Sequence, residues 1–344
     1  MNTFPKRRNI GERGLKTDGG DEQITKNPNT KEKVNGRDLY FGAAYKNEFM
    51  QPMPFFWTSD GNSVNTLIGH YRGGVAFLIA GGPSFKDLDK TRLARCWSLG
   101  LNNSPKTFRP DAWISVDDPS RFLRSVWLDP KIMKFQAASM AGKRLWDTQN
   151  NQPLGLVPRD CPNVYYFKRN SKFHEKRWLQ EDSLNWGNAE DFGGGRTVML
   201  PAIKVMYLLG FRTIYLVGVD LDMSATRTYH FDEKRDKGAV KCNNNTYKRM
   251  NQEYFPKLRP EFEKAGLDVF NCNSDSKLTA FDYVPYEEAL DHALYYPGDM
   301  ENESTFGLYD KPEKKFKEYE ERVAAEKAQK DTKEEQEECQ QVVN

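Results

Sequence analysis

The sequence contains few cysteines, and none of them is arranged in pairs. There are five, an odd number, and no two have the Cys-x-x-Cys spacing that zinc sites and redox motifs use. This pattern excludes a disulfide framework and a cysteine-based zinc site, and it indicates a reducing compartment. The cysteines are Cys96, Cys161, Cys242, Cys272 and Cys339.

The sequence also lacks a long apolar run and an excess of charge of either sign. No stretch of about 18 apolar residues is present, so we predict no transmembrane helix. The first residues lack the apolar core of a signal peptide, and we therefore expect a cytoplasmic protein. With 51 basic and 49 acidic residues the net charge is +2, which gives no electrostatic basis for a stable nucleic-acid partner.

Three common site motifs are absent. The chain has no Gly-x-Gly-x-x-Gly with a matching acidic residue, which excludes the usual dinucleotide fingerprint. No Gly-Lys-Ser/Thr ends a glycine-rich loop, which excludes a P-loop. Gly-x-Ser-x-Gly is missing as well, so the nucleophile elbow of the α/β hydrolases is not expected.

What the sequence does contain is a series of short apolar runs that alternate with amphipathic segments. Continuous apolar runs predict strands buried on both faces, and the alternation predicts a doubly wound, mainly parallel sheet in one main domain, an α/β fold of the Rossmann-like class. The runs 243–246 and 271–276, rich in asparagine, predict loops. Strands are expected at 75–80, 97–101, 112–116, 134–138, 163–167, 213–219 and 268–271, and helices after Ser84, at 198–209 and at 251–265.

The first strand ends in Gly81-Gly82-Pro83-Ser84. Two glycines allow a ligand to approach the backbone, and Ser84 can cap a following helix whose N-terminus would hold phosphate. The alternative is a strand-to-helix turn that needs glycine only for its geometry. From the residues alone the two interpretations are equally good.

Small, amide and acidic residues follow several other strands. Because ligands of open parallel sheets bind beyond the carboxyl ends of the strands, these loops predict a nucleotide site, although Asn and Asp also simply favour turns. A divalent cation could bind at Asp117 and Asp118. The residues are Asn102 and Asn103, Asp117 and Asp118, Gly194 to Thr197, and Asp220.

Two blocks of the sequence resemble a known superfamily. The segment 79–93 is similar to the N-terminal motif of the bacterial CMP-sialic-acid-dependent sialyltransferases. That motif is shared by motility-accessory-factor-like proteins and by hydroxymethylpterin pyrophosphokinases. The segment 195–220, with Tyr229-His230-Phe231-Asp232 after it, resembles the second conserved block of these proteins. The chain departs from the pattern in lacking an asparagine between Gly81 and Gly82, and any histidine between His230 and His292.

The resemblance implies roles for individual residues. The nucleotide phosphates would lie at Gly81, Gly82, Pro83 and Ser84. The donor would be contacted by Asn102 or Asn103, Asp117 would face the transferred group, and Asp220 would anchor a strand end. The site would be closed by Gly194, Gly195, Arg196 and Thr197.

His230 is the first candidate for a general base, because neutral imidazole can take a hydroxyl proton near neutral pH, and Asp232 and Glu233 are the alternatives. A structural histidine is an equally good interpretation. The expected function is transfer of a sugar from a nucleotide-activated donor to an unidentified hydroxyl acceptor. The alternatives are a Mg²⁺-dependent pyrophosphokinase that uses ATP, and a non-catalytic nucleotide-binding protein.

The chain is expected to divide into four regions. Residues 1–36 are a disordered basic arm and 37–72 an aromatic-rich extension. The Rossmann-like nucleotide-binding catalytic domain covers 73–300. Residues 301–344 form a charged tail, helical or disordered, without the sustained heptad pattern that would predict an oligomer.

Overall fold

The computed structural model describes residues 56–167, 169–170, 184–185, 197–224, 229–233, 235–294 and 303–342. The chain divides into two compact units, Met1–Tyr296 and Pro297–Asn344, which are treated separately below. The predicted arm at 1–36 and the first part of the predicted extension, 37–55, lie outside the described residues.

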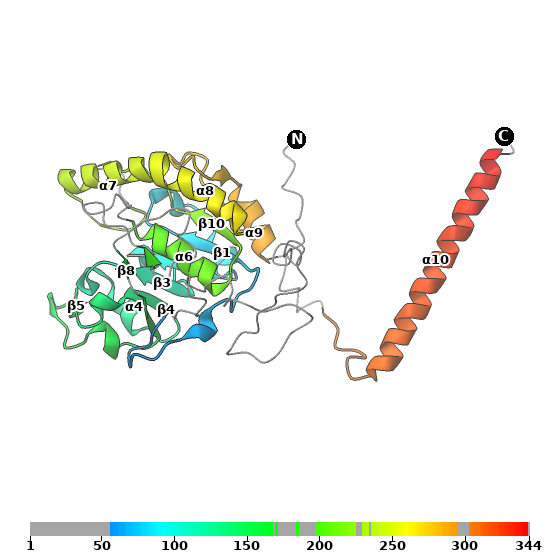
Figure 1. Cartoon of the computed structure of the whole chain (residues 1–344), viewed down its shortest axis with the longest axis horizontal. Helices are drawn as coiled ribbons and strands as arrows, with labels where there is room; N and C mark the ends of the chain where they lie inside the picture. The colour runs from blue at the N-terminus through cyan, green and yellow to red at the C-terminus, as the bar shows by residue number, and fades with distance from the viewer. Residues whose placement is uncertain are drawn as a thin grey trace, which may run out of the picture. The chain divides into compact units, whose positions relative to one another are not determined.

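The first unit is built around an eight-stranded sheet in which every neighbouring pair of strands is parallel (Figure 1). The order across the sheet is β12-β11-β10-β1-β2-β3-β4-β7. The predicted α/β, parallel fold is confirmed. The strands are β1 (Val75–Ile79), β2 (Ser98–Leu101), β3 (Ala112–Ser115), β4 (Met133–Ala137), β7 (Val164–Phe167), β10 (Thr213–Val217), β11 (Asp268–Asn271) and β12 (Asp282–Tyr283).

The strands β1 and β10 are mainly apolar because helices cover both faces of the sheet. From β1, Ala76 and Leu78 belong to a core that contains α6 (Met199–Leu209) and α8 (Phe255–Lys264). Phe77 and Ile79 belong to a second core with α3 (Lys90–Leu93) and α9 (Tyr286–Leu294). Alternate residues of one strand therefore serve opposite layers, which is the arrangement of a doubly wound sheet.

The predicted helix at 198–209 is present as α6, and all eleven of its residues are buried. It ends at Gly210, whose φ of 111° is one that L side chains rarely adopt. A Cβ on Gly210 would also lie 2.8 Å from the backbone of Tyr71 and Arg72. Glycine is therefore required at this helix end for both conformation and space.

The expectation of a loop at 243–246 is wrong, because these residues belong to α7 (Lys237–Arg249). Asp236 caps the helix by accepting a 2.8 Å hydrogen bond from the Ala239 amide. The Asn244 amide accepts from the Met223 N–H at 3.0 Å and donates to the Met223 carbonyl at 2.7 Å. A π-helical turn, Met250–Tyr254, then joins α7 to α8, and Figure 1 shows the three as one continuous run.

The remaining elements of this unit are short. They are α4 (Arg124–Leu128), the antiparallel pair β5 (Trp146–Asp147) and β6 (Gln152–Pro153), and the parallel pair β8 (Arg169–Asn170) and β9 (Leu184–Asn185). Trp57 pairs with the outer edge of β7: the N–H groups of Trp57 and Tyr166 donate to each other's carbonyls at 2.9 and 2.7 Å. Phe56 beside them is fully buried.

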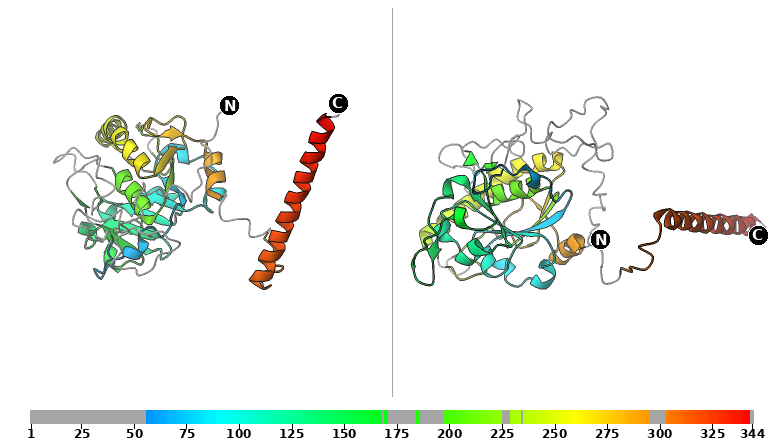
Figure 2. Two further views of the ribbon diagram at one scale, coloured as in Figure 1. Left: turned by 45° about the vertical axis from the view of Figure 1, so that its right-hand side comes forward. Right: turned by 90° about the horizontal axis from the view of Figure 1, so that it is seen from below.

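The described part of the second unit consists mainly of the 31-residue helix α10 (Pro312–Val342), drawn without interruption in Figure 2. Its surface carries i,i+4 ion pairs such as Lys314–Glu318 at 3.7 Å and Lys317–Glu321 at 3.8 Å. Across all described residues, none of the helices combines the length and the apolar character that crossing a membrane requires.

Candidate functional site

The order of the strands reverses between β1 and β10. From β1 the chain proceeds outward through β2, β3, β4 and β7, and it then returns to β10 on the other side of β1. In open α/β sheets, ligands bind in the crevice beyond the carboxyl ends of the strands at such a reversal. The loops after β1, β2, β3 and β10 meet there, so most of the predicted site residues share one edge of the sheet.

Asp220, in the loop after β10, joins three loops at this edge. Its carboxylate is almost fully buried. One oxygen accepts hydrogen bonds from the Ser84 hydroxyl at 2.9 Å and from the Ser84 amide at 3.4 Å. The other oxygen accepts from the Asn273 amide at 3.3 Å, in the loop after β11. The negative charge of Asp220 therefore lies directly against the loop predicted to hold phosphate.

Gly82 is a glycine because Asp220 occupies the space of its side chain. A Cβ on Gly82 would stand 1.9 Å from a carboxylate oxygen of Asp220 and 2.4 Å from the Gly218 carbonyl. The backbone conformation is ordinary, with φ of −67° and ψ of 150°. The Gly82 N–H donates to the Gly218 carbonyl at 2.7 Å. Packing within the protein thus accounts for this glycine, and its N–H is already engaged.

The expectation of a helix directly after Ser84 is wrong, whereas phosphate binding at Gly81 to Ser84 stays a prediction. The chain forms only a three-residue 3₁₀ turn, Pro83–Phe85, before the separate four-residue helix α3. Ser84 does not cap a helix, since its hydroxyl donates to Asp220. Asp89 caps α3 instead, accepting from the Thr91 amide at 2.8 Å.

Gly81 makes room for the loop 229–233. A Cβ on Gly81 would lie 2.9 Å from the Tyr229 ring, and that ring stacks on Phe231 with centroids 4.9 Å apart and planes 3° from parallel. The Gly81 carbonyl accepts a 3.0 Å hydrogen bond from the His230 amide. The loop after β10 therefore packs directly on the loop after β1.

The His230 imidazole is buried, with both ring nitrogens hydrogen-bonded. Nε2 lies 3.2 Å from the Ala80 carbonyl and Nδ1 lies 2.7 Å from the Thr107 hydroxyl. Because a carbonyl can only accept, Nε2 carries the proton, and Nδ1 of the neutral ring accepts from Thr107. Burial lowers the pKa of His230 to about 4, so the ring is neutral near pH 7. This geometry corresponds to the structural interpretation of His230.

Four buried polar atoms at the ends of β2 and β3 have no hydrogen-bond partner among the described residues: Asn102 Oδ1, Asn103 Oδ1, Ser104 Oγ and Ser115 Oγ. Ser104 and Ser115 are 1% and 0% exposed. Buried polar groups in proteins are paired in the great majority of cases, since an unpaired one costs about 1–3 kcal/mol. The four unpaired atoms lie at or just after the ends of β2 and β3, on the edge of the sheet that carries the strand reversal.

Asn103 is held in place by its other amide atom. Its Nδ2 donates to the Arg121 carbonyl at 3.1 Å and to Glu233 at 3.4 Å. Glu233 also pairs with Arg235 at 2.5 Å. The loop after β2 is therefore tied to the loop after β10, while the buried Asn103 Oδ1 has no partner among the described residues.

The Asp117–Asp118 pair is partly used within the protein. One Asp118 oxygen accepts from the Ser120 amide at 3.0 Å and from the Ser120 hydroxyl at 2.7 Å. Burial raises the pKa of Asp118, but these hydrogen bonds outweigh it, and the net shift is downward. Asp117 is half exposed and lies 3.7 Å from Arg121. Among the described residues, no cluster of three or more His, Cys, Asp or Glu side chains could hold a metal ion. A cation at this pair stays a prediction.

The last predicted segment is only partly described. Gly194, Gly195 and Arg196 lie outside the described residues. The Thr197 hydroxyl accepts a 3.2 Å hydrogen bond from the Met199 amide at the start of α6. Asp232 is exposed in the loop after β10. The sequence pattern includes Ser104 in the polar loop 102–104 but misses Ser115, although Ser115 is a polar residue at the end of an apolar strand, and that is the signal that points to it.

Comparisons with known proteins leave the family open. No protein-family model and no curated protein sequence matches the chain. Two solved structures of the sialyltransferase CstII from Campylobacter jejuni are similar in part. The complex with the substrate analogue CMP-3FNeuAc has a TM-score of 0.31 at 13% identity and covers 61% of this chain and 86% of that one. The complex with cytidine-5'-monophosphate has a TM-score of 0.31 at 12% identity and covers 62% of this chain and 85% of that one. At these values the likeness does not assign this chain to a family.

Proposed function

We propose that this protein is a glycosyltransferase-like enzyme that transfers a sugar from a nucleotide-activated donor to a hydroxyl acceptor. The observation that carries the proposal is the group of unpaired buried atoms on Asn102, Asn103, Ser104 and Ser115 beside the strand reversal. The resemblance of the segments 79–93 and 195–220 to the sialyltransferase superfamily supports the donor class.

In this proposal the donor completes the hydrogen bonds of those four residues. Amide oxygens accept only, so Asn102 and Asn103 would receive O–H or N–H groups, such as ribose or sugar hydroxyls or a base amino group. The serine hydroxyls can donate or accept. Arg121 is 67% exposed at the adjacent turn and is 3.7 Å from Asp117, and it would pair with a phosphate of the donor.

The transfer step breaks the bond between the anomeric carbon and the nucleotide phosphate, whose oxygen leaves with the bonding electrons. The acceptor oxygen forms the new bond at that carbon and gives its proton to a base. We assign the base to Asp232, because it is exposed at this edge of the sheet. His230 positions the loop that carries Asp232, through its contacts with Ala80 and Thr107. Because Asp118 already caps a turn, the pyrophosphokinase alternative has less support than sugar transfer.

The experiment is a calorimetric titration of the full-length protein with cytidine, uridine, guanosine and adenosine nucleotides and their sugar conjugates, each with and without Mg²⁺. We expect at least one nucleotide family to bind, its sugar conjugate to be hydrolysed slowly, and Asp232→Asn to abolish hydrolysis without loss of binding. Absence of binding by every nucleotide and conjugate would overturn the proposal. Release of AMP from ATP would instead identify a pyrophosphokinase.

A further inference from the structure

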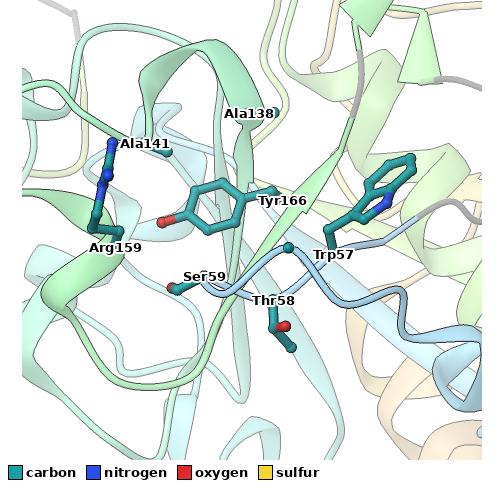
Figure 3. A pocket seen from close by; sticks show the side chains of 8 residues that line it. Trp57, Thr58, Ser59, Ala138, Ala141, Arg159 and Tyr166 are labelled. Atoms are coloured by element: carbon teal, nitrogen blue, oxygen red, sulfur yellow. The ribbon is translucent and has the colours of Figure 1, made fainter.

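A pocket of about 400 Å³ opens at the carboxyl ends of β4 and β7, on the same edge of the sheet as the proposed donor site (Figure 3). None of the site residues predicted from the sequence lines this pocket. Its polar lining comes from Ser59, Arg159 and Tyr166, and its apolar lining includes Trp57 and Ala138. Three separate segments of the chain thus converge on it.

Tyr166 contributes a phenol to the wall of the pocket. The residue is 4% exposed, and its hydroxyl makes no hydrogen bond of normal geometry with the described residues. Figure 3 shows the hydroxyl directed toward Arg159 and Ser59. Burial raises the pKa of Tyr166, and the neighbouring Ser59 side chain offsets part of that rise. The phenol is therefore protonated at neutral pH and can donate a hydrogen bond.

Arg159 supplies a positive charge that the described part of the protein does not neutralise. No described carboxylate lies within ion-pair distance of its guanidinium. A Cβ on Gly142 would stand 3.1 Å from Arg159 Nη2, so the guanidinium lies over the bare backbone of that glycine. The pocket therefore pairs a guanidinium, the group that best matches carboxylate and phosphate, with a phenolic donor.

The remaining walls suit a compact, partly apolar ligand body. Trp57 is a lining residue fixed by its backbone pairing with Tyr166, and Figure 3 shows its ring on the side away from Arg159. The small side chain of Ala138 leaves space for a ligand at its part of the wall. The Thr58 hydroxyl donates to Asp60 and is not available. A guanidinium and hydroxyl groups beside apolar walls, around a pocket of this size, fit a sugar ring that carries an anionic group.

We propose that this pocket binds the acceptor, a sugar that bears a carboxylate or a phosphate; the acceptor role rests on the proposed function. The unpaired donor-site atoms lie at the ends of β2 and β3, and the pocket lies at the ends of β4 and β7. Strands in a sheet are about 4.8 Å apart, so the two sites are separated by on the order of 10 Å. An acceptor held by Arg159 can extend one or two sugar rings toward the donor across that distance.

Ligand-observed NMR on the full-length protein without nucleotide tests the pocket. The probes are glucuronate for a carboxylate, glucose 6-phosphate for a phosphate, and glucose as the uncharged control. We expect one anionic probe to bind at least about tenfold more tightly than glucose, and that probe identifies the anionic group. Arg159→Gln and Tyr166→Phe should each weaken its binding about fivefold or more, while Arg95→Gln, a change at an exposed arginine next to α3, should leave it unchanged.

Equal binding of glucose and both anionic probes, or unchanged binding in both pocket variants, would overturn the proposal. Tyr166→Phe removes only one hydroxyl beside Ser59, and Arg159 is exposed, so both variants should fold. Nucleotide titration of Arg159→Gln separates the two proposals. Retained nucleotide affinity with lost anion binding supports both sites. Anion binding that depends on Arg159, in a protein that binds no nucleotide, would leave the pocket but remove its role as an acceptor site.

Discussion

The Ser84 hydroxyl donates a 2.9 Å hydrogen bond to the carboxylate of Asp220, a residue 136 positions further along the chain. This bond crosses the strand reversal and fixes the loop after β1 against the loop after β10. It also explains two features of the loop 81–84: why Ser84 does not cap a helix, and why residue 82 has no side chain.

A double-mutant cycle measures this link. We expect Ser84→Ala and Asp220→Ala each to lower the free energy of unfolding by about 1.5–3 kcal/mol, because a hydrogen bond to a buried charged group is lost. The two effects should overlap by at least about 1 kcal/mol in urea unfolding. Additive effects within about 0.5 kcal/mol would mean that the two residues act independently.

Gly82→Ala should destabilise the protein by about 3 kcal/mol or more, because the new methyl group would overlap the Asp220 carboxylate and the Gly218 carbonyl. Gly155→Ala is the matched control, since nothing lies within 4 Å of a Cβ at Gly155. Its effect should stay within about 0.5 kcal/mol. A Gly82→Ala protein as stable as Gly155→Ala in chemical unfolding is incompatible with the packing described here.

His230 should make the stability depend on pH. Its pKa is about 4 in the folded protein and about 6.5 when unfolded, so the unfolded state binds the proton more readily. The contribution of the neutral ring is therefore complete above about pH 6.5 and is lost as the pH falls toward about 4. The difference in unfolding free energy between wild type and His230→Asn should shrink over this range. The carboxylates titrate in both proteins, so their effect cancels in this difference. A difference that is constant or grows on acidification would contradict the buried neutral imidazole.

Lys134 should stabilise the region around the start of β4 despite the cost of burying its charge. Its side chain is fully buried, and Nζ donates to the carbonyls of Asp129, Ile132 and Pro162 at 2.6, 2.9 and 2.7 Å. Burial lowers the pKa of Lys134 to about 8. Lys134→Met keeps much of the volume but leaves three acceptors unpaired, and we expect a loss of about 2–4 kcal/mol. An equally stable or more stable Lys134→Met protein would show that desolvation of the ammonium outweighs its three hydrogen bonds.

The sequence predicts the central strands well because burial on both faces leaves a readable apolar run, as in Val75–Ile79 and Thr213–Val217. The edge strand β12 has two residues and no such run. Helix α7 is missed for a related reason: none of its residues is buried, so it has no apolar face to detect. It is supported by the Asp236 cap and by Asn244, which are contacts that a sequence pattern does not encode.

The sequence predicts in part where the residues of the candidate site lie. Strand ends are visible in the sequence, and the fold brings the loops at Gly81, Asn103 and Asp220 to one edge. What each side chain does there depends on partners far along the chain. The sequence cannot show that Asp220 fills the space beside Gly82, or that Thr107 holds His230. The pocket around Arg159 and Tyr166 has no motif at all, since its residues come from three separate segments.

The central claim is that the unpaired Oγ atoms of Ser104 and Ser115 form hydrogen bonds with the nucleotide donor when it binds. It is tested most directly by measuring stability and nucleotide affinity in Ser104→Ala and Ser115→Ala. Removing a buried hydroxyl without a partner should leave the ligand-free protein unchanged or up to about 1 kcal/mol more stable. The same change should weaken binding of the nucleotide donor about tenfold, which corresponds to about 1.4 kcal/mol. Variants that are less stable than wild type by more than about 1 kcal/mol, yet bind the nucleotide as tightly, would show that these hydroxyls serve the fold and not a donor.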